Sequence, residues 1–293
     1  MQPVLNGLAA GSVIAISALA FLIVSRTAGG LHLAHGAIVA WGGIVTLAMA
    51  PSGAAQLVVA AGAALFMTTL LGVFLEIGVY GPLASARAGA SAIMLSSLAA
   101  YVFLAGVLTT VLGPNARYPT FQTMRASVEV PFGTALISPV QLVQVISAAL
   151  ICTAIPLALR STRLGLYVRA QADDPELLEV MGGPTRRIRV VAAGVGGAMA
   201  GLVGVLTAMD VGMDANYGLT AVVTAAVVSF AAGSRIGFVT ASFGILLGII
   251  HAQIGAHVDM RWGMGALYSL LLLPLIALRR GVGVAGFGIR ATR

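Results

Sequence analysis

Two histidines, His32 and His35, stand three residues apart at the start of a glycine-rich apolar run. On a helix this spacing puts both imidazoles on one face, where they can act together as metal ligands or hydrogen-bonding groups. A zinc site needs two further ligands, and the candidates, His251, His257 and Asp259, show no recurring metal-ligand spacing. The pattern predicts no metal site and leaves open what else the two imidazoles do.

Patterns typical of covalent catalysis and of nucleotide binding are missing from the sequence. It contains neither G-x-S-x-G nor H-E-x-x-H, and its serines lie in apolar runs, where hydroxyls commonly bond to nearby backbone. It has no lysine, so it cannot supply the lysine of a nucleotide-binding P-loop. The single cysteine, Cys152, fits a small buried apolar side chain. We therefore predict a protein that is not an enzyme, binds no cofactor and leaves any ATP hydrolysis to another polypeptide.

The most polar stretch between two apolar runs is residues 160–187, which hold four of the nine acidic residues. Asp173 or Asp174 suits a helix N-cap, Pro175 suits the first turn, and Gly182 supplies a stop. The pattern predicts a short polar helix, about two turns long, that is presented to a partner. The alternative is a solvated loop that carries a capped helix and binds nothing.

The composition is that of a polytopic membrane protein. Of 293 residues, 59% are hydrophobic and 9% are charged, whereas about a quarter are charged in a typical soluble domain. The formal charge of +7 comes from arginine alone. With the N-terminus outside and nine crossings, thirteen of the sixteen arginines lie inside, which puts 160–187 in the cytoplasm. Because these arginines occupy short loops that set orientation, we do not infer nucleic acid as a partner.

We expect one all-α transmembrane domain over residues 1–293, built as a polytopic bundle of helices. The expected spans are 3–24, 31–50, 56–80, 91–112, 140–159, 188–209, 219–232, 238–257 and 262–278. Glycines weaken the opening of the second span, and 219–232 is too short to cross comfortably, so both are expected to be broken or half-helices. If 219–232 is re-entrant, there are eight crossings. Interrupted segments in both halves indicate a possible inverted repeat with a pathway between the halves.

Several local features refine this picture. The external loop at 113–139 is expected to carry a small strand or hairpin near 126–130. Pro156 is expected to kink or end its helix. Glu76 is taken as the only charge within the membrane, and pairing with Arg87 or reaching the interface is favoured over a proton site. Gly7-x-x-x-Gly11 and the small residues of 196–204 predict close contacts between helices.

The start of the short segment 219–232 is a second place where chemistry is expected. Asn216 and Tyr217 precede it, and the N-terminal dipole of a half-helix can face a carboxylate. The alternative is that Asn216 only caps the helix. For His35, a role in a solute pathway and a hydrogen bond to a backbone carbonyl between helices both stay open.

The sequence resembles the permeases of ABC importers, specifically the branched-chain amino acid (Liv-type) uptake family, over nearly its whole length. Within 160–187 the matching residues are Thr162, Leu164-Gly165, Arg169-Ala170, Asp174-Pro175-Glu176 and Met181-Gly182. In the second span the match is Leu33-Ala34-His35-Gly36, with His32 in place of the asparagine of the family. Ala231-Ala232-Gly233-Ser234 keeps part of a pair of glycines that the family often shows.

The resemblance implies a cytoplasmic coupling helix that docks into a groove on a separate ATPase. The residues assigned to coupling are Arg163, Gly165, Arg169, Asp173, Asp174, Pro175, Glu176 and Gly182, and those assigned to the substrate pathway are His32, His35, Asn216 and Tyr217. The implied partners are two ATPase subunits, a homologous second permease or a second copy, a periplasmic solute-binding protein and the lipids of a bacterial inner membrane.

The implied function is ATP-driven uptake of branched-chain or other small amino acids or amides. The alternative is a self-sufficient channel or ion-coupled carrier for a small polar solute. For that alternative we expect several charges within the membrane.

Overall fold

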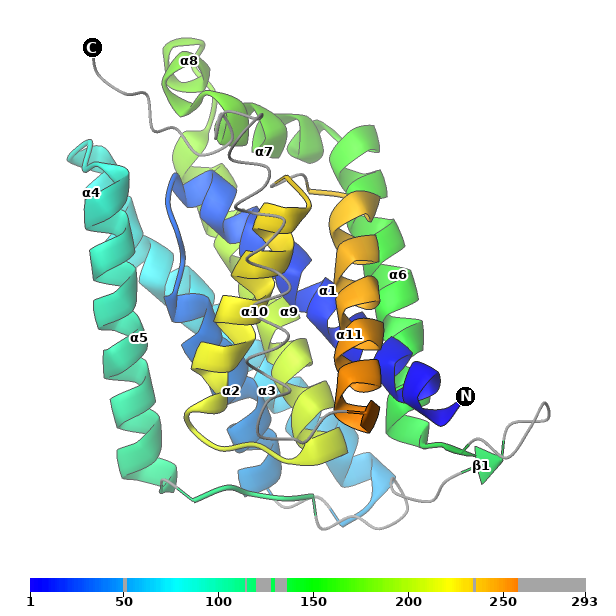
Figure 1. Ribbon diagram of the computed structural model, residues 1–293. Coiled ribbons are helices and arrows are strands. Elements are labelled where there is room, and N and C mark those ends of the chain that lie inside the picture. The colour runs from blue at the N-terminus through cyan, green and yellow to red at the C-terminus, as the bar shows by residue number, and fades with distance from the viewer. Residues whose placement is uncertain (50–51, 114, 120–127, 130–135, 234–235, 258–293) are drawn as a thin grey trace.

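A computed structural model describes residues 1–257, apart from 50–51, 114, 120–127, 130–135 and 234–235 (Figure 1). The predicted span 262–278 lies outside the described residues. The elements are α1 (Gln2–Ala28), α2 (Ala34–Ala48), α3 (Ala54–Leu75), the π-helical η1 (Glu76–Tyr80), α4 (Gly81–Ser85), α5 (Ala90–Leu112), β1 (Val128–Glu129), β2 (Leu136–Ile137), α6 (Pro139–Ser161), α7 (Arg163–Asp173), α8 (Pro175–Val180), α9 (Thr185–Val211), α10 (Tyr217–Ala231) and α11 (Phe238–His257).

The helices confirm an all-α polytopic bundle. Among the described residues, six helical stretches are long and apolar enough to cross a membrane: Gln2–Ala28, Ala54–Ser85, Ala90–Leu112, Pro139–Ser161, Thr185–Val211 and Phe238–His257. The helices α2 and α10 have 15 residues each. At 1.5 Å per residue each is about 22 Å long, against a bilayer core of about 30 Å, so the predicted half-helices are confirmed.

The bundle has two distinct ends. One end carries α7 and α8 and is called the α7–α8 face; the opposite end carries the paired strands β1 and β2 and is called the hairpin face (Figure 1). Val128 pairs with Ile137 and Glu129 with Leu136, which confirms a small hairpin in the loop where one was predicted. The side chain of Gln2 bonds both the N–H and the carbonyl of Leu136 at 2.8 Å, so the start of α1 is tied to this hairpin.

The helices α1 and α9 form the centre of the bundle and run in opposite directions (Figure 1). Their partners are exchanged: α1 packs against α10 and α11, and α9 packs against α2 and α3. In contrast, α3, α5 and α6 bury only a minor share of their apolar stretches and expose large side chains such as Phe66, Phe103 and Leu150. The exchange of partners is the arrangement expected of an inverted repeat of α1–α3 and α9–α11.

Backbone contacts at glycines hold the central helices together. A Cβ on Gly36 in α2 would clash with the carbonyl oxygen of Gly218 in α10, and one on Gly218 would clash with the carbonyl oxygen of Gly36. Gly11 of α1 meets α11 in the same way, with a built Cβ 2.6 Å from the Ile245 carbonyl oxygen. These contacts confirm the predicted close approach at Gly11 and make the crossing of the two half-helices a contact of backbone on backbone.

Two local predictions need correction. Of the two outcomes expected at Pro156, an end of the helix is wrong, because α6 continues through Pro156 to Ser161; a kink there stays a prediction. The predicted single helix in 160–187 is two helices, because the eleven residues of α7 precede α8. A Thr162 hydroxyl accepts from the Gly165 amide at 3.0 Å and so caps α7, an N-terminal signal that the sequence does contain.

Candidate functional site

A cavity of about 240 Å³ lies between α1, α6, α9, α10 and α11, toward the hairpin face. Its apolar wall comes from α1, α9 and α10, and on α1 the lining residues Ala10, Val13 and Ile14 follow helical spacing. The polar lining residues are Ser17, Gln144, Thr207, Asp210, Tyr217, Thr220, Thr224 and His251. A mainly apolar cavity with a few convergent polar groups is the form of a small-molecule site.

Asp210 and Gln144 form the polar end of this cavity. The Gln144 amide nitrogen donates to the Asp210 carboxylate at 3.2 Å and to the Leu206 carbonyl at 3.3 Å. The Gln144 side-chain oxygen is buried and has no hydrogen-bond partner among the described residues, and the same is true of the hydroxyls of Thr207 and Ser17. Asp210 lies on the last turn of α9, so the expectation that Glu76 is the only charge within a span is wrong.

The two residues expected to face a solute at the start of the second half-helix, Asn216 and Tyr217, lie in different environments. Tyr217 lines the cavity, whereas Asn216 is exposed and makes no side-chain cap. Asp214 takes the capping position instead, because its carboxylate accepts from the Tyr217 amide at 2.7 Å. A carboxylate of the protein therefore already occupies the helix end at which a substrate carboxylate was expected.

His32 and His35 lie apart from the cavity, at the start of α2. His32 lies in the link before the helix, so the two do not share a helical face as expected. The His32 ring packs against Tyr80 of η1 with centroids 4.5 Å apart, and the His35 ring meets Phe21 edge-on at 6.2 Å. Both imidazoles are buried, and neither nitrogen of His35 has a hydrogen-bond partner among the described residues, so no backbone carbonyl bonded to its ring is seen there.

The coupling residues lie on α7 and α8 with the caps that the sequence predicts for α8. The Asp174 carboxylate accepts from the Leu177 amide at 2.9 Å, Pro175 occupies the first turn, and Gly182 ends the segment with a left-handed φ of 77°. Gly165 is buried where α7 turns away from α6, and a Cβ there would clash with the backbone of Leu159. The side chains of Arg163, Arg169, Asp173 and Glu176 are exposed.

An apolar surface accompanies these charges. Leu177, Val180 and Met181 are 57%, 85% and 77% exposed, although α8 is only six residues long. Leu164 and Leu166 on α7 are also exposed. On its inner side α8 buries Leu178 against Val168 of α7 and Ile188 of α9. The segment is thus anchored on one side and presents apolar side chains on the other, as a docking surface does.

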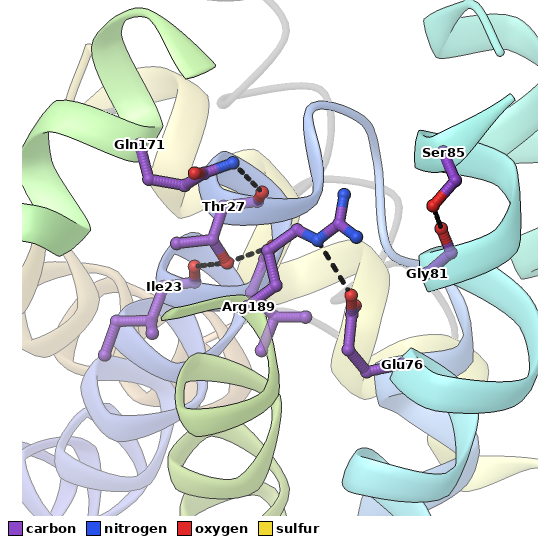
Figure 2. A network of polar contacts seen from close by, with 8 residues as sticks. Ile23, Thr27, Glu76, Gly81, Ser85, Gln171 and Arg189 are labelled. Carbon is purple, nitrogen blue, oxygen red and sulfur yellow. Dashed lines mark hydrogen bonds and ion pairs between the residues drawn. The ribbon is translucent and has the colours of Figure 1, made fainter. Parts of the chain in front are cut away.

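The helix α7 contacts two of the helices that line the cavity, α1 and α9. Gln171 of α7 is buried and donates to the Thr27 carbonyl at the end of α1, and Arg26 pairs with Asp173 at 3.3 Å (Figure 2 shows the Gln171 contact). Ile188, in the first turn of α9, packs on Val168. The helix α7 is therefore in contact with α1 and α9, whose other ends carry Ala10 and Asp210.

A second ion pair fixes α9 to the π-helical turn. The Arg189 Nε lies 3.0 Å from the Glu76 carboxylate, and the two side chains are 13% and 3% exposed (Figure 2). The partner of Glu76 is thus Arg189 and not Arg87, which lies in the turn between α4 and α5. The pair borders a pocket near the α7–α8 face that Glu179 and Arg186 also line. A π-helical turn is uncommon and often marks a functional segment of a helix.

The comparisons with known proteins agree with this architecture. Residues 4–278 match the family model of the branched-chain amino acid transport system permease component. The chain is 26% identical to the high-affinity branched-chain amino acid transport system permease protein LivH of Salmonella typhimurium, over 96% of this chain and 94% of that protein. It is 25% identical to LivH of Escherichia coli K12, over the same shares, and 27% identical to BraD of Pseudomonas aeruginosa, over 98% and 95%. An all-α multi-pass bundle with paired half-helices and a match over almost its full length shows that the chain belongs to the permease family of branched-chain amino acid transport systems.

Proposed function

We propose that this chain moves branched-chain or other small apolar amino acids across a bacterial inner membrane, powered by ATPase subunits that dock on α7 and α8. The carrying observation is the contact of α7 with α1 and α9, the two helices that form much of the cavity wall. ATP-driven closure of two docked ATPases would displace α7 and α8, and α1 and α9 would then change access to the cavity.

The orientation follows from the charges. Five arginines lie in or beside α7 and α8, which supports a cytoplasmic location for this face: Arg160, Arg163, Arg169, Arg186 and Arg187. The cavity then lies toward the periplasm, where a solute-binding protein would deliver substrate. A second permease, homologous or identical, completes the pore in this proposal. His32 and His35, buried at the start of α2, are proposed as part of the closed section of the pathway on the cytoplasmic side.

The docking proposal is tested by reversing one charge on α8 and replacing one exposed apolar side chain there with a charged one. Glu176→Arg combined with Val180→Glu should release the ATPase chains during purification in mild detergent and abolish ATP-dependent leucine uptake in vesicles. Both side chains are exposed, so the amount of permease in the membrane should stay unchanged. Arg87→Glu, a charge reversal in the α4–α5 turn, is the matched control and should retain the ATPases.

The opposite results would favour the alternative function. Leucine uptake by the purified single chain without ATP would identify a self-sufficient carrier. Normal ATP-dependent uptake by the Glu176→Arg, Val180→Glu variant would refute the docking surface and leave the pathway assignment to be judged separately.

A further inference from the structure

We propose that Asp210, together with Gln144 and Thr207, binds the primary ammonium group of the solute in the cavity. The site would select amines and zwitterionic amino acids and would reject simple carboxylates. This inference rests on the proposed transport function, because it names the chemical group that the same cavity recognises.

The charge of the cavity supports this assignment. The ion pairs between described residues are Arg26 with Asp173 and Arg189 with Glu76, and neither includes Asp210. The hydrogen bond recorded for the Asp210 carboxylate comes from the neutral Gln144 amide, at 3.2 Å. A carboxylate in a mainly apolar cavity is costly unless a cation approaches it, so the site favours a positively charged group.

The unpaired acceptors match an ammonium group in number and kind. An alkylammonium has three N–H donors and no acceptor. Asp210 offers carboxylate oxygen, and the buried Gln144 Oε1 and Thr207 Oγ1 have no partner among the described residues. The Gln144 amide is held in one orientation because its nitrogen donates to both Leu206 and Asp210, which leaves the oxygen free to accept. Gln144 and Thr207 are 1% and 6% exposed, so both side chains lie away from the outer surface of the protein.

The remaining surface of the cavity indicates what is attached to the ammonium. Val13, Ile14, Val203 and Ala225 line it with aliphatic groups, and its volume of about 240 Å³ suits a short branched chain. The α10 N-terminus, the nearest end of a helix dipole that would favour an anion, is already capped by Asp214. An aliphatic body with an ammonium head fits this distribution, whereas an aliphatic carboxylate would meet Asp210.

The experiment measures binding of radiolabelled leucine to the purified complex of this chain with its partner subunits in lipid nanodiscs, with two competitors. Isoamylamine keeps the ammonium group and side chain of leucine, and isocaproate keeps the carboxylate and side chain. Isoamylamine should displace leucine and isocaproate should not. Asp210→Asn should weaken leucine binding about tenfold or more, the ratio expected when a hydrogen-bonded charge is lost.

Two further variants separate recognition from folding. Thr207→Val removes one acceptor with little change of shape and should weaken leucine binding severalfold. Asp214→Asn is the matched control, because asparagine also caps helices and Asp214 does not line the cavity; its leucine binding should equal that of the wild type.

The outcomes distinguish this inference from the proposed function. Absence of ATP-dependent leucine uptake by the wild-type complex would count against the proposed function. If that complex takes up leucine, any of three results overturns the Asp210 site alone: Asp210→Asn binds leucine as the wild type does, isocaproate competes and isoamylamine does not, or the wild-type complex binds no leucine.

Discussion

Breaking the buried ion pair of Glu76 and Arg189 should lower the free energy of unfolding by different amounts, depending on which of the two residues is replaced. Arg189→Gln leaves a carboxylate that is 3% exposed without its cation, and we expect the free energy of unfolding to fall by about 3–5 kcal/mol. Glu76→Gln leaves a guanidinium that is 13% exposed and borders the pocket lined by Glu179. Water and that carboxylate compensate in part, so we expect a smaller loss of about 1–3 kcal/mol.

The double variant tests whether the two charges stabilise each other. When both are replaced by glutamine, no unpaired charge is buried, and the cost should fall below that of Arg189→Gln alone. The assay is reversible unfolding by SDS titration in mixed micelles, with Arg187→Gln as an exposed control that should change stability by no more than about 0.5 kcal/mol. Equal losses for the two single variants, or a double variant whose loss is their sum, would refute the reasoning.

Three further predictions concern helix packing, a helix cap and an exposed ion pair. Gly36→Ala should lower the thermal midpoint in detergent and the uptake rate, because its Cβ would clash with Gly218 backbone, whereas Gly62→Ala, with no atom within 4 Å of its Cβ, should leave both unchanged or slightly improved. Asp174→Ala should speed hydrogen exchange at the Leu177 amide as the α8 cap, worth about 1 kcal/mol, is lost; Asp174→Asn should restore protection, and equal protection in all three proteins would disprove the cap. Asp173→Asn should change stability by less than about 1 kcal/mol, because the carboxylate that faces Arg26 is 76% exposed, and a larger drop in the SDS titration would contradict this.

The parts of the structure that were predicted well are those specified by local sequence. The half-helix α10 follows from the number of apolar residues between Gly218 and Gly233, and α8 follows from Asp174, Pro175 and Gly182. Each of these signals acts within a few residues of the element that it defines. The Asp214 cap was also readable, since Asp214 stands three residues before the amide that it accepts from.

The parts that were missed depend on which helices become neighbours. Glu76 and Arg189 are 113 residues apart, so the sequence alone favours the nearby Arg87 as the partner of Glu76, and that prediction is wrong. Asp210 and Gln144 meet only because α6 packs beside the last turn of α9. Asp210 stands at the boundary between an apolar run and a polar link, where its sequence context does not distinguish a lining residue from a solvated one.

The packing of α1 against α11 also determines when the fold can be completed during synthesis. The most extensive contact of α1 is with α11, and the close approach at Gly11 receives the backbone of Ile245. At a typical elongation rate of 5–20 residues per second, α11 follows α1 by roughly 10–50 s. Throughout that interval the face of α1 that carries Gly11 is open to lipid or to other membrane proteins. The packing of α1 is therefore completed only when α11 has been made, and release of the chain before then would leave the Gly11 face of α1 in the membrane without its partner helix.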